Sequence, residues 1–255
     1  METVGDHLRE WRRRRGLSQL RLAVEAEISS RHLSFVETGR AGASREMLLR
    51  LAECLEVPLR ARNAMLLTAG YAPVYGERPP TDPELAAVEA VLTAYAPYPA
   101  LAVDRHWNLV AANGAVAPLL VGVDPTLLDP PVNVLRLSLH PDGLAPRIDN
   151  LLEWRAHLLA RLRGQALTTG DPVLRELSHE LSGLPVPLRG EKPSIATTRI
   201  AVPLRLRVGE SVLAFLSTTT VFGTPLDVTL SELAIEAFLP ADDATRAALR
   251  GDDPG

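Results

Sequence analysis

Arg155 is a charged residue among apolar ones, and of all positions in this sequence it most needs a partner. If residues 148–162 form a helix with about 100° per residue, their bulky apolar residues share one face, and Arg155 lies at its middle. An unpaired buried charge is very costly. The guanidinium must therefore reach solvent, pair with a carboxylate of the protein, or bind an anionic ligand. The apolar residues of that face are Ile148, Leu151, Leu152, Leu158, Leu159 and Leu162.

A second group of polar residues lies upstream of this helix. Asn133, Arg136 and His140 are three and four residues apart, which places them on one face if the stretch is helical. They form either a solvated helix edge, with His140 near the helix C-terminus, or the polar part of a ligand pocket. Trp154 and Phe215 are predicted as core residues that would also line such a pocket.

Catalytic and metal-binding motifs are missing from the sequence. It contains no G-x-S-x-G nucleophile elbow, no P-loop and no cysteine–histidine cluster with metal-ligand spacing. The single cysteine, Cys54, cannot form an intramolecular disulfide, which fits a reducing compartment. We therefore predict no catalytic residue, no metal and no cofactor. An enzyme domain assembled from distant residues remains an alternative.

Charge is distributed unevenly along the 255 residues, whose formal net charge is −4. Residues 1–70 contain 12 arginines against 9 acidic residues, whereas the remainder is acidic. Such asymmetry points to a nucleic-acid-binding end. No apolar run approaches the ~20 residues of a membrane helix, and the acidic start METVGDHLREW is unlike a signal or transit peptide. The expected location is the cytoplasm, with no membrane partner.

Five short helices are predicted over residues 4–69. Apolar residues recur there at helical spacing, serines suited to N-caps precede three of the helices, and glycines follow two of them. These signals are Ser18, Ser29, Ser44, Gly16 and Gly39. The short turn between the second and third helices is typical of a helix-turn-helix, whose second helix enters the major groove of DNA. We expect this domain over residues 1–70 and a proline-rich linker over residues 71–83.

The rest of the chain is predicted to mix helices and strands. Helices are expected over residues 84–95 and, interrupted by prolines and Gly170, within residues 133–182. Five stretches with alternating or β-branched residues predict one antiparallel sheet. The fold class is thus α+β, with a regulatory domain over residues 84–240 and a tail, residues 241–255, that forms a frayed helix followed by disorder. The expected strands cover residues 100–104, 107–111, 200–206, 211–220 and 231–239.

The segment SQLRLAVEAEISSRHLSFVETGRAGASREMLLRLAECL resembles the XRE-type, lambda-repressor-like DNA-binding domain, and RHLSFVETGR is close to a signature of it. The resemblance implies that Arg31 meets base edges and can bind a guanine bidentately. It also implies that Gln19 and Arg40 contact phosphates. The DNA-binding residues that it implies are Gln19, Ser29, Ser30, Arg31, Ser34 and Arg40.

Two positions depart from the pattern of that family. Glu27 stands where the family has a turn glycine, so we expect a non-glycine residue with positive φ there, at a cost of about 1 kcal/mol. Gly42 and Ala43 replace a basic residue and proline after the reading helix, which removes one phosphate contact. Glu37 is expected to brace the fold, because a carboxylate repels phosphate.

From Pro99 onward the chain resembles the ligand-binding domain of MmyB-like regulators, a PAS-like fold of five antiparallel strands with helices. The segments that carry the resemblance are YPALAVDRHWNLVAANGAVAPLL, PPVNVLRLSLHPDGLAPRIDNLLEWRAHLLARLR and FGTPLDVTLSELAIEAFLP. The resemblance implies a small apolar ligand and, more specifically, a fatty-acyl ligand whose acid group Arg155 would bind. The predicted ligand set is Arg155, Asn133, Arg136, His140, Trp154 and Phe215.

The function expected from the sequence is a ligand-responsive transcription regulator that binds double-stranded operator DNA as a homodimer. A DNA-binding domain fused to a protein-interaction or dimerisation domain that takes no ligand is the alternative from a different class.

Overall fold

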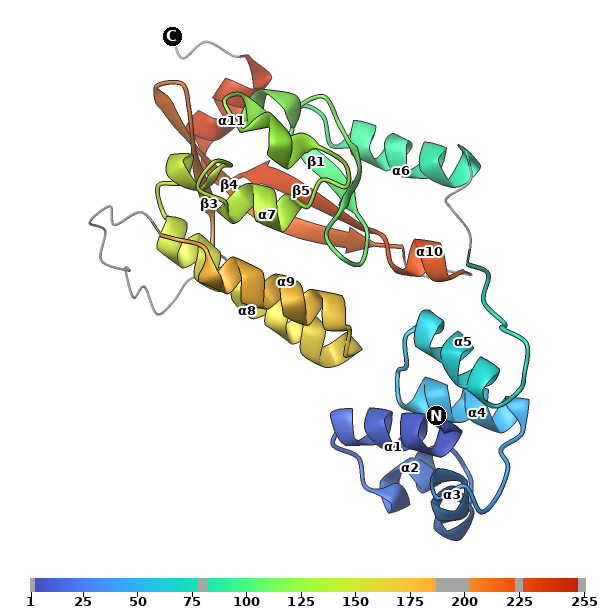
Figure 1. Ribbon diagram of the computed structural model, residues 1–255. Helices are drawn as coiled ribbons and strands as arrows, with labels where there is room; N and C mark the ends of the chain where they lie inside the picture. Colours follow the sequence, from blue (N-terminus) through green and yellow to red (C-terminus); the bar gives the residue numbers. More distant parts are fainter. Residues whose placement is uncertain (1–2, 78–81, 187–201, 223–226, 252–255) are drawn as a thin grey trace. The chain divides into compact units, whose positions relative to one another are not determined.

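The computed structural model describes residues 3–77, 82–186, 202–222 and 227–251, which form two compact units. Residues 3–77 of the first unit contain five helices that follow one another closely (Figure 1). Their bounds are α1 (Val4–Arg14), α2 (Gln19–Glu25), α3 (Ser30–Glu37), α4 (Arg45–Cys54) and α5 (Leu59–Thr68). The five-helix domain predicted from the sequence is confirmed.

Local hydrogen bonds set the ends of these helices. The hydroxyls of Ser18, Ser29 and Ser44 each accept a bond from a main-chain N–H in the first turn of the helix that follows, as predicted. Thr3 and Asp6 form a capping box at the start of α1. Glu27, in the turn between α2 and α3, has a φ of 54°, so the expected strained position is present.

A short segment from far along the chain also belongs to the first unit. Helix α10 (Val228–Ser231) packs against α5, and the N–H of Val228 donates to the carbonyl of Gly76 over 2.9 Å. The sequence pattern predicted a strand from Ser231, but Ser231 ends α10 and the strand begins only at Ala234. Nothing in the local spacing indicates this packing, because it joins residues about 150 positions apart.

The second unit is built on a five-stranded antiparallel sheet with the strand order β2-β1-β5-β4-β3, which confirms the α+β fold class. Its first and last strands in this order, β2 and β3, have their outer edges covered by loop segments at residues 132–134 and 148–149. The strands are β1 (Ala100–Val103), β2 (Leu109–Ala112), β3 (Leu204–Val208), β4 (Ser211–Val221) and β5 (Ala234–Pro240).

Two helices side by side, α8 (Leu151–Thr169) and α9 (Pro172–Gly183), pack over one face of this sheet (Figure 1). Residues that alternate along the strands meet them there; Leu206 and Phe215 are fully buried, with Trp154 of α8 in the same apolar cluster. The short helix α7 (Val134–Leu139) contacts α9, and α6 (Asp82–Ala94) contacts β1 and β2. Gly170, with a φ of 70°, ends α8.

The predicted tail contains helix α11 (Asp243–Arg250), capped by Asp242, while the disorder predicted after it lies outside the described residues. Three short 3-10 helices cover residues 117–120, 125–128 and 145–147. Among the described residues, no helix has both the length and the apolar character needed to cross a membrane.

Candidate DNA-binding surface and ligand-binding domain

Helix α3 presents its polar side to solvent and its apolar side to the core. Leu33 and Val36 are buried, while Ser30 and Arg31 are exposed. The guanidinium of Arg31 lies over the ring of Phe35, 5.4 Å from its centroid. Within the described residues Arg31 makes no hydrogen bond or ion pair with the protein, so its N–H donors are available to an outside acceptor.

The other predicted DNA-binding residues surround this helix. Ser29 is exposed and accepts a bond from the N–H of His32 over 3.1 Å, Ser34 is half-buried, and Arg40 is exposed directly after α3. The structure therefore brings Ser29, Ser30, Arg31, Ser34 and Arg40 to α3 and its two ends. Whether they contact DNA stays a prediction.

Gln19, at the first position of α2, is held by a buried carboxylate. Its Nε2 donates to Oε2 of Glu37 over 2.7 Å, and Glu37 also accepts two bonds from Arg12 of α1, at 2.7 and 2.9 Å. Burial raises the pKa of Glu37, but the hydrogen bonds from Arg12 and Gln19 and the charge of Arg12 outweigh it, so the pKa lies below its ordinary value. Glu37 braces the fold as expected. One amide N–H of Gln19 remains for a phosphate.

Some arginines elsewhere on this unit pair with carboxylates, unlike three arginines at α3 and the start of α4. Arg14 and Arg21 pair with glutamates on their own helices. Arg31, Arg40 and Arg45 have no ion-pair or hydrogen-bond partner for their side chains among the described residues. Sequence reasoning missed Arg45. A basic residue just after the Ser44 cap, where the helix dipole disfavours a cation, was the available signal.

Arg155 lies on α8, and its guanidinium bonds the C-terminal end of α9 instead of lying in the middle of a buried face. Its Nη2 donates to the carbonyls of Leu181 and Ser182, at 3.0 and 2.6 Å, which are groups that a helix end leaves without partners. The helix predicted from Ile148 begins three residues later, because Ile148 bridges to Leu206 at the edge of the sheet. Leu152 is 43% exposed. The buried apolar face of α8 therefore includes fewer residues than the sequence predicted, because Ile148 lies outside the helix and Leu152 is exposed.

The side chains of the three polar residues around α7 are all bonded to groups of the protein. Asn133 caps α7 by accepting from the N–H of Arg136, whose guanidinium binds Glu180 of α9 through two bonds of 2.6 and 2.8 Å. His140 follows the last residue of α7, and its Nδ1 accepts from the N–H of Asp142. Arg136 and Arg155 thus both hold α9.

The remaining two members of the predicted ligand set, Trp154 and Phe215, are buried in the apolar core. The indole N–H of Trp154 donates to the hydroxyl of Ser138 over 3.1 Å. These contacts hold the six residues within the protein, and their role as ligand contacts stays a prediction.

An ion pair inside the second unit was not foreseen from the sequence. Glu236, on the central strand β5, is only 3% exposed, and it accepts two bonds from Arg161 of α8, at 3.0 and 2.5 Å. Ser217 and Thr219 of β4 donate to the same carboxylate. The guanidinium lies 4.6 Å from the ring centroid of Trp107. Such a pair positions α8 on the sheet.

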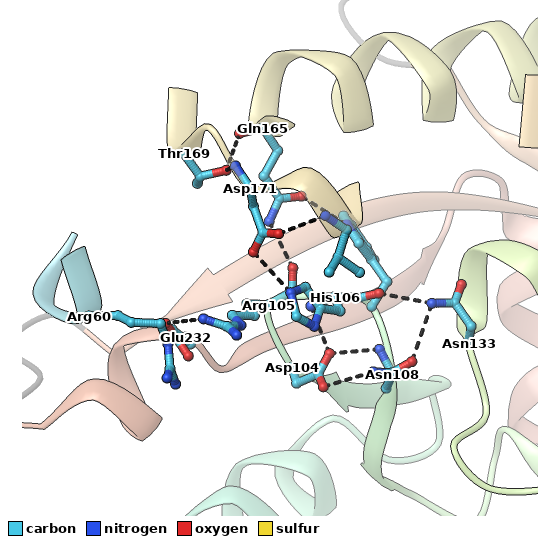
Figure 2. A network of polar contacts seen from close by, with 12 residues as sticks. Arg60, Asp104, Arg105, His106, Asn108, Asn133, Gln165, Thr169, Asp171 and Glu232 are labelled. Carbon is cyan, nitrogen blue, oxygen red and sulfur yellow. Dashed lines mark hydrogen bonds and ion pairs between the residues drawn. The ribbon is translucent and has the colours of Figure 1, made fainter. Parts of the chain in front are cut away.

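A second polar network ties the turn between β1 and β2 to the corner between α8 and α9 (Figure 2). Asp104 accepts bonds from the N–H groups of His106 and Asn108, which orders the turn. Nε2 of His106 lies 2.9 Å from Oδ2 of Asp171, the N-cap residue of α9. Asn133 donates to the carbonyl of His106 over 2.8 Å.

The turn also holds Trp107 with a φ of 68°, a strained conformation for an aromatic residue. Its indole N–H donates to Oε1 of Gln165 on α8 over 2.8 Å. The hairpin turn therefore contacts α8 through Trp107 and α9 through His106, and the two helices are fixed to the sheet at this end.

Comparisons with known protein families find a match for each of the two units. Residues 3–65 match the model of a helix-turn-helix domain, and residues 85–251 match that of the MmyB-like transcription regulator ligand binding domain. No curated protein matches the chain. The two matched domains are regulatory, and the second match spans most of the chain. The chain therefore belongs to the MmyB-like transcription regulators and is a DNA-binding regulator with a helix-turn-helix domain followed by a ligand-binding domain.

Proposed function

We propose that this protein binds one operator sequence specifically, as a homodimer, and that a small apolar, fatty-acid-like molecule controls this binding. The observation that carries the proposal is the polar side of α3, where Arg31 is exposed and its guanidinium has no hydrogen-bond or ion-pair partner among the described residues. A helix that follows a short turn and exposes such a side chain suits the major groove.

Base reading is assigned to Ser30, Arg31 and Ser34. A guanidinium bonds O6 and N7 of guanine bidentately, which discriminates against other bases by about 1–3 kcal/mol. Hydroxyls accept from or donate to either base edge, so Ser30 and Ser34 add contacts of lower selectivity.

Phosphate binding is assigned to residues at the edges of the same surface. Gln19 keeps one amide N–H free, and Ser29 lies at the N-terminal end of α3. Arg40, after α3, and Arg45, the first residue of α4, provide two cations. Contacts of this kind fix the position of a reading helix without selecting a sequence. Arg45 compensates for the phosphate contact that Gly42 and Ala43 do not make.

A homodimer is proposed because a single α3 reads only a few base pairs. Helix-turn-helix proteins reach high selectivity by binding two half-sites about one helical turn of DNA apart. The ligand then acts by changing the affinity of the dimer for its operator, and by linkage the operator changes the affinity for the ligand by the same factor.

DNA binding is tested with the purified full chain and the DNA upstream of its own coding sequence. We expect a shifted band in a mobility assay, a protected region with two-fold sequence symmetry in a footprint, and weaker binding at higher salt. A control fragment of the same length and base composition in scrambled order should bind much more weakly. Equal binding of both fragments would remove sequence-specific recognition.

Ligand binding is tested by native mass spectrometry of gently purified protein. A captured small molecule adds mass that disappears on denaturation, whereas an interaction domain without a ligand shows the mass of the chain alone. Repeated absence of added mass would favour the protein-interaction alternative.

A further inference from the structure

The centre of the exposed face of α3 carries an aromatic side chain. Leu33, Val36 and Glu37 are buried and define the inner side of this helix. At about 100° per residue, Arg31 and Phe35 both lie within about 30° of the direction opposite to that inner side. The two residues that point most directly away from the core are therefore an arginine and a phenylalanine.

Phe35 takes little part in the core of the first unit. Within residues 3–77, Leu33 and Val36 belong to the apolar cluster that forms this core, whereas Phe35 does not, and its side chain is only half-buried. An aromatic ring usually contributes its large apolar area to a core or to an interface. Part of the ring of Phe35 is thus available to a molecule that meets α3.

The ring of Phe35 and the guanidinium of Arg31 are neighbours one helical turn apart. Cζ of Arg31 lies 5.4 Å from the ring centroid, within the range of a cation–π attraction. Such a contact restricts the long arginine side chain before a partner arrives, so less conformational freedom is lost on binding. It does so without using an N–H donor in a hydrogen bond to oxygen or nitrogen, and the donors stay available for a base.

The major groove of DNA offers a partner to both groups. Guanine presents the acceptors O6 and N7, which suit a guanidinium, and thymine presents a 5-methyl group, which the ring of a phenylalanine can contact. Successive base pairs are about 3.4 Å apart along the DNA, whereas the guanidinium and the ring are 5.4 Å apart. Two groups at this spacing suit base pairs that are one or two steps apart.

We infer that Phe35 is a further specificity-determining residue. Its ring holds the guanidinium of Arg31 for a guanine and contacts the 5-methyl group of a thymine one or two base pairs away. The inference rests on the proposed function, because it concerns the sequence that α3 reads. It adds to that function a guanine and a thymine as near neighbours in each half-site, and a recognition role for an apolar residue.

The first test changes single groups of the DNA and leaves the protein unmodified. Duplexes that bind the full chain are selected from a random pool, and the preferred half-site should contain a guanine with a thymine within two base pairs, on either strand. Deoxyuridine in place of that thymine in one half-site removes only the methyl group. It should weaken binding about fourfold, the equivalent of one buried methyl group. Deoxyuridine at a thymine outside the half-sites is the control and should change nothing.

The second test combines modified DNA with substitutions in α3. Phe35→Gln removes the ring, and this variant should bind the thymine and deoxyuridine duplexes equally. 7-Deazaguanine, which lacks the N7 acceptor of guanine, should weaken binding of the unmodified chain about tenfold and that of Phe35→Gln less, because Arg31 is no longer held. Phe35→Tyr keeps a ring and should preserve both discriminations. Arg31→Ala should lose the guanine discrimination and keep that for thymine.

A matched control removes an exposed apolar side chain elsewhere on the same unit. Leu67→Gln, at a position of α5 that is 59% exposed, should keep both discriminations. Circular dichroism and thermal unfolding check that each variant is folded. If Phe35→Gln does not fold, the comparison of thymine with deoxyuridine on the unmodified chain still decides.

Three results would overturn the inference. They are equal binding of the thymine and deoxyuridine duplexes by the unmodified chain, a full preference for thymine in Phe35→Gln, and an undiminished effect of 7-deazaguanine in that variant. A selected sequence whose methyl group has no effect removes this inference alone. Selection that returns no common sequence from the random pool would instead remove the proposed function.

Discussion

Arg12 of α1 and Glu37 of α3 form a bidentate ion pair, with Nε of Arg12 2.7 Å from Oε1 and Nη2 2.9 Å from Oε2. Glu37 is 1% exposed, and it also accepts from Gln19 at the start of α2. One carboxylate thus joins three helices of the DNA-binding domain. It fixes α3, which carries the proposed base-reading residues, relative to α2, which carries Gln19, a proposed phosphate contact.

Replacing that carboxylate should destabilise the first unit strongly. Glu37→Ala leaves Arg12 mostly buried without its partner, and we expect the free energy of unfolding to fall by about 3 kcal/mol. Urea denaturation followed by circular dichroism measures it. Glu25→Ala, which breaks the exposed pair with Arg21 on α2, is the control and should cost less than about 1 kcal/mol. Equal losses in the two variants would contradict a special role for Glu37.

Base reading and phosphate binding should separate by mutation. Arg31→Ala is expected to reduce the preference for the operator over scrambled DNA, while Gln19→Ala and Arg40→Ala weaken binding to both. Loss of the phosphate contact of the cationic Arg40 lowers the slope of log affinity against log salt by about 1, whereas loss of the contact of the uncharged Gln19 leaves the slope nearly unchanged. Mobility assays over a salt series measure both effects. Arg13→Ala, on α1, is the control for a mere loss of charge, and a result equal to that of Arg31→Ala would refute base reading.

Glycine in place of Glu27, in the turn between α2 and α3, should stabilise the folded protein. Glu27 has a φ of 54°, which strains a side-chain-bearing residue by about 1–2 kcal/mol, whereas glycine adopts it freely. After the entropy that glycine loses on folding, Glu27→Gly should raise the unfolding free energy by about 0.5 kcal/mol. Glu25→Gly, inside α2, should lower it. Urea denaturation that ranks the two variants in the opposite order would show that the turn is unstrained.

At low pH the second unit should lose stability, because Asp171 becomes protonated. Burial raises the pKa of this carboxyl, but the hydrogen bonds from His106 and from the N–H of Val173, together with nearby positive charge, lower it more. A lowered pKa in the folded state means that the stabilisation is present above the ordinary value of 3.8 and is lost as the pH falls through the folded value.

Asp171→Asn keeps a side chain that caps α9 but removes this charge. Differential scanning calorimetry between pH 6 and pH 3 should therefore show a lower melting temperature for the variant at pH 6. The gap should narrow towards pH 3. A constant gap over that range would mean that the His106 contact does not depend on the charge of Asp171.

Sequence alone determined the elements that depend on neighbours along the chain. Ser18, Ser29 and Ser44 cap helices whichever partners those helices later find, because the hydroxyl bonds an N–H only three residues away. Residues 204–206 and 212–216 alternate between core and solvent for an equally local reason. The five helices of the first unit and the five-stranded sheet of the second followed from such signals.

Tertiary structure decided what depends on distant segments. Arg161 and Glu236 are 75 residues apart, and α10 packs against α5, a helix much earlier in the chain. No local sequence period encodes either contact. Arg155 has the spacing of a core residue, yet it bonds the end of α9, because the packing of α9 on α8 places unpaired carbonyls beside it.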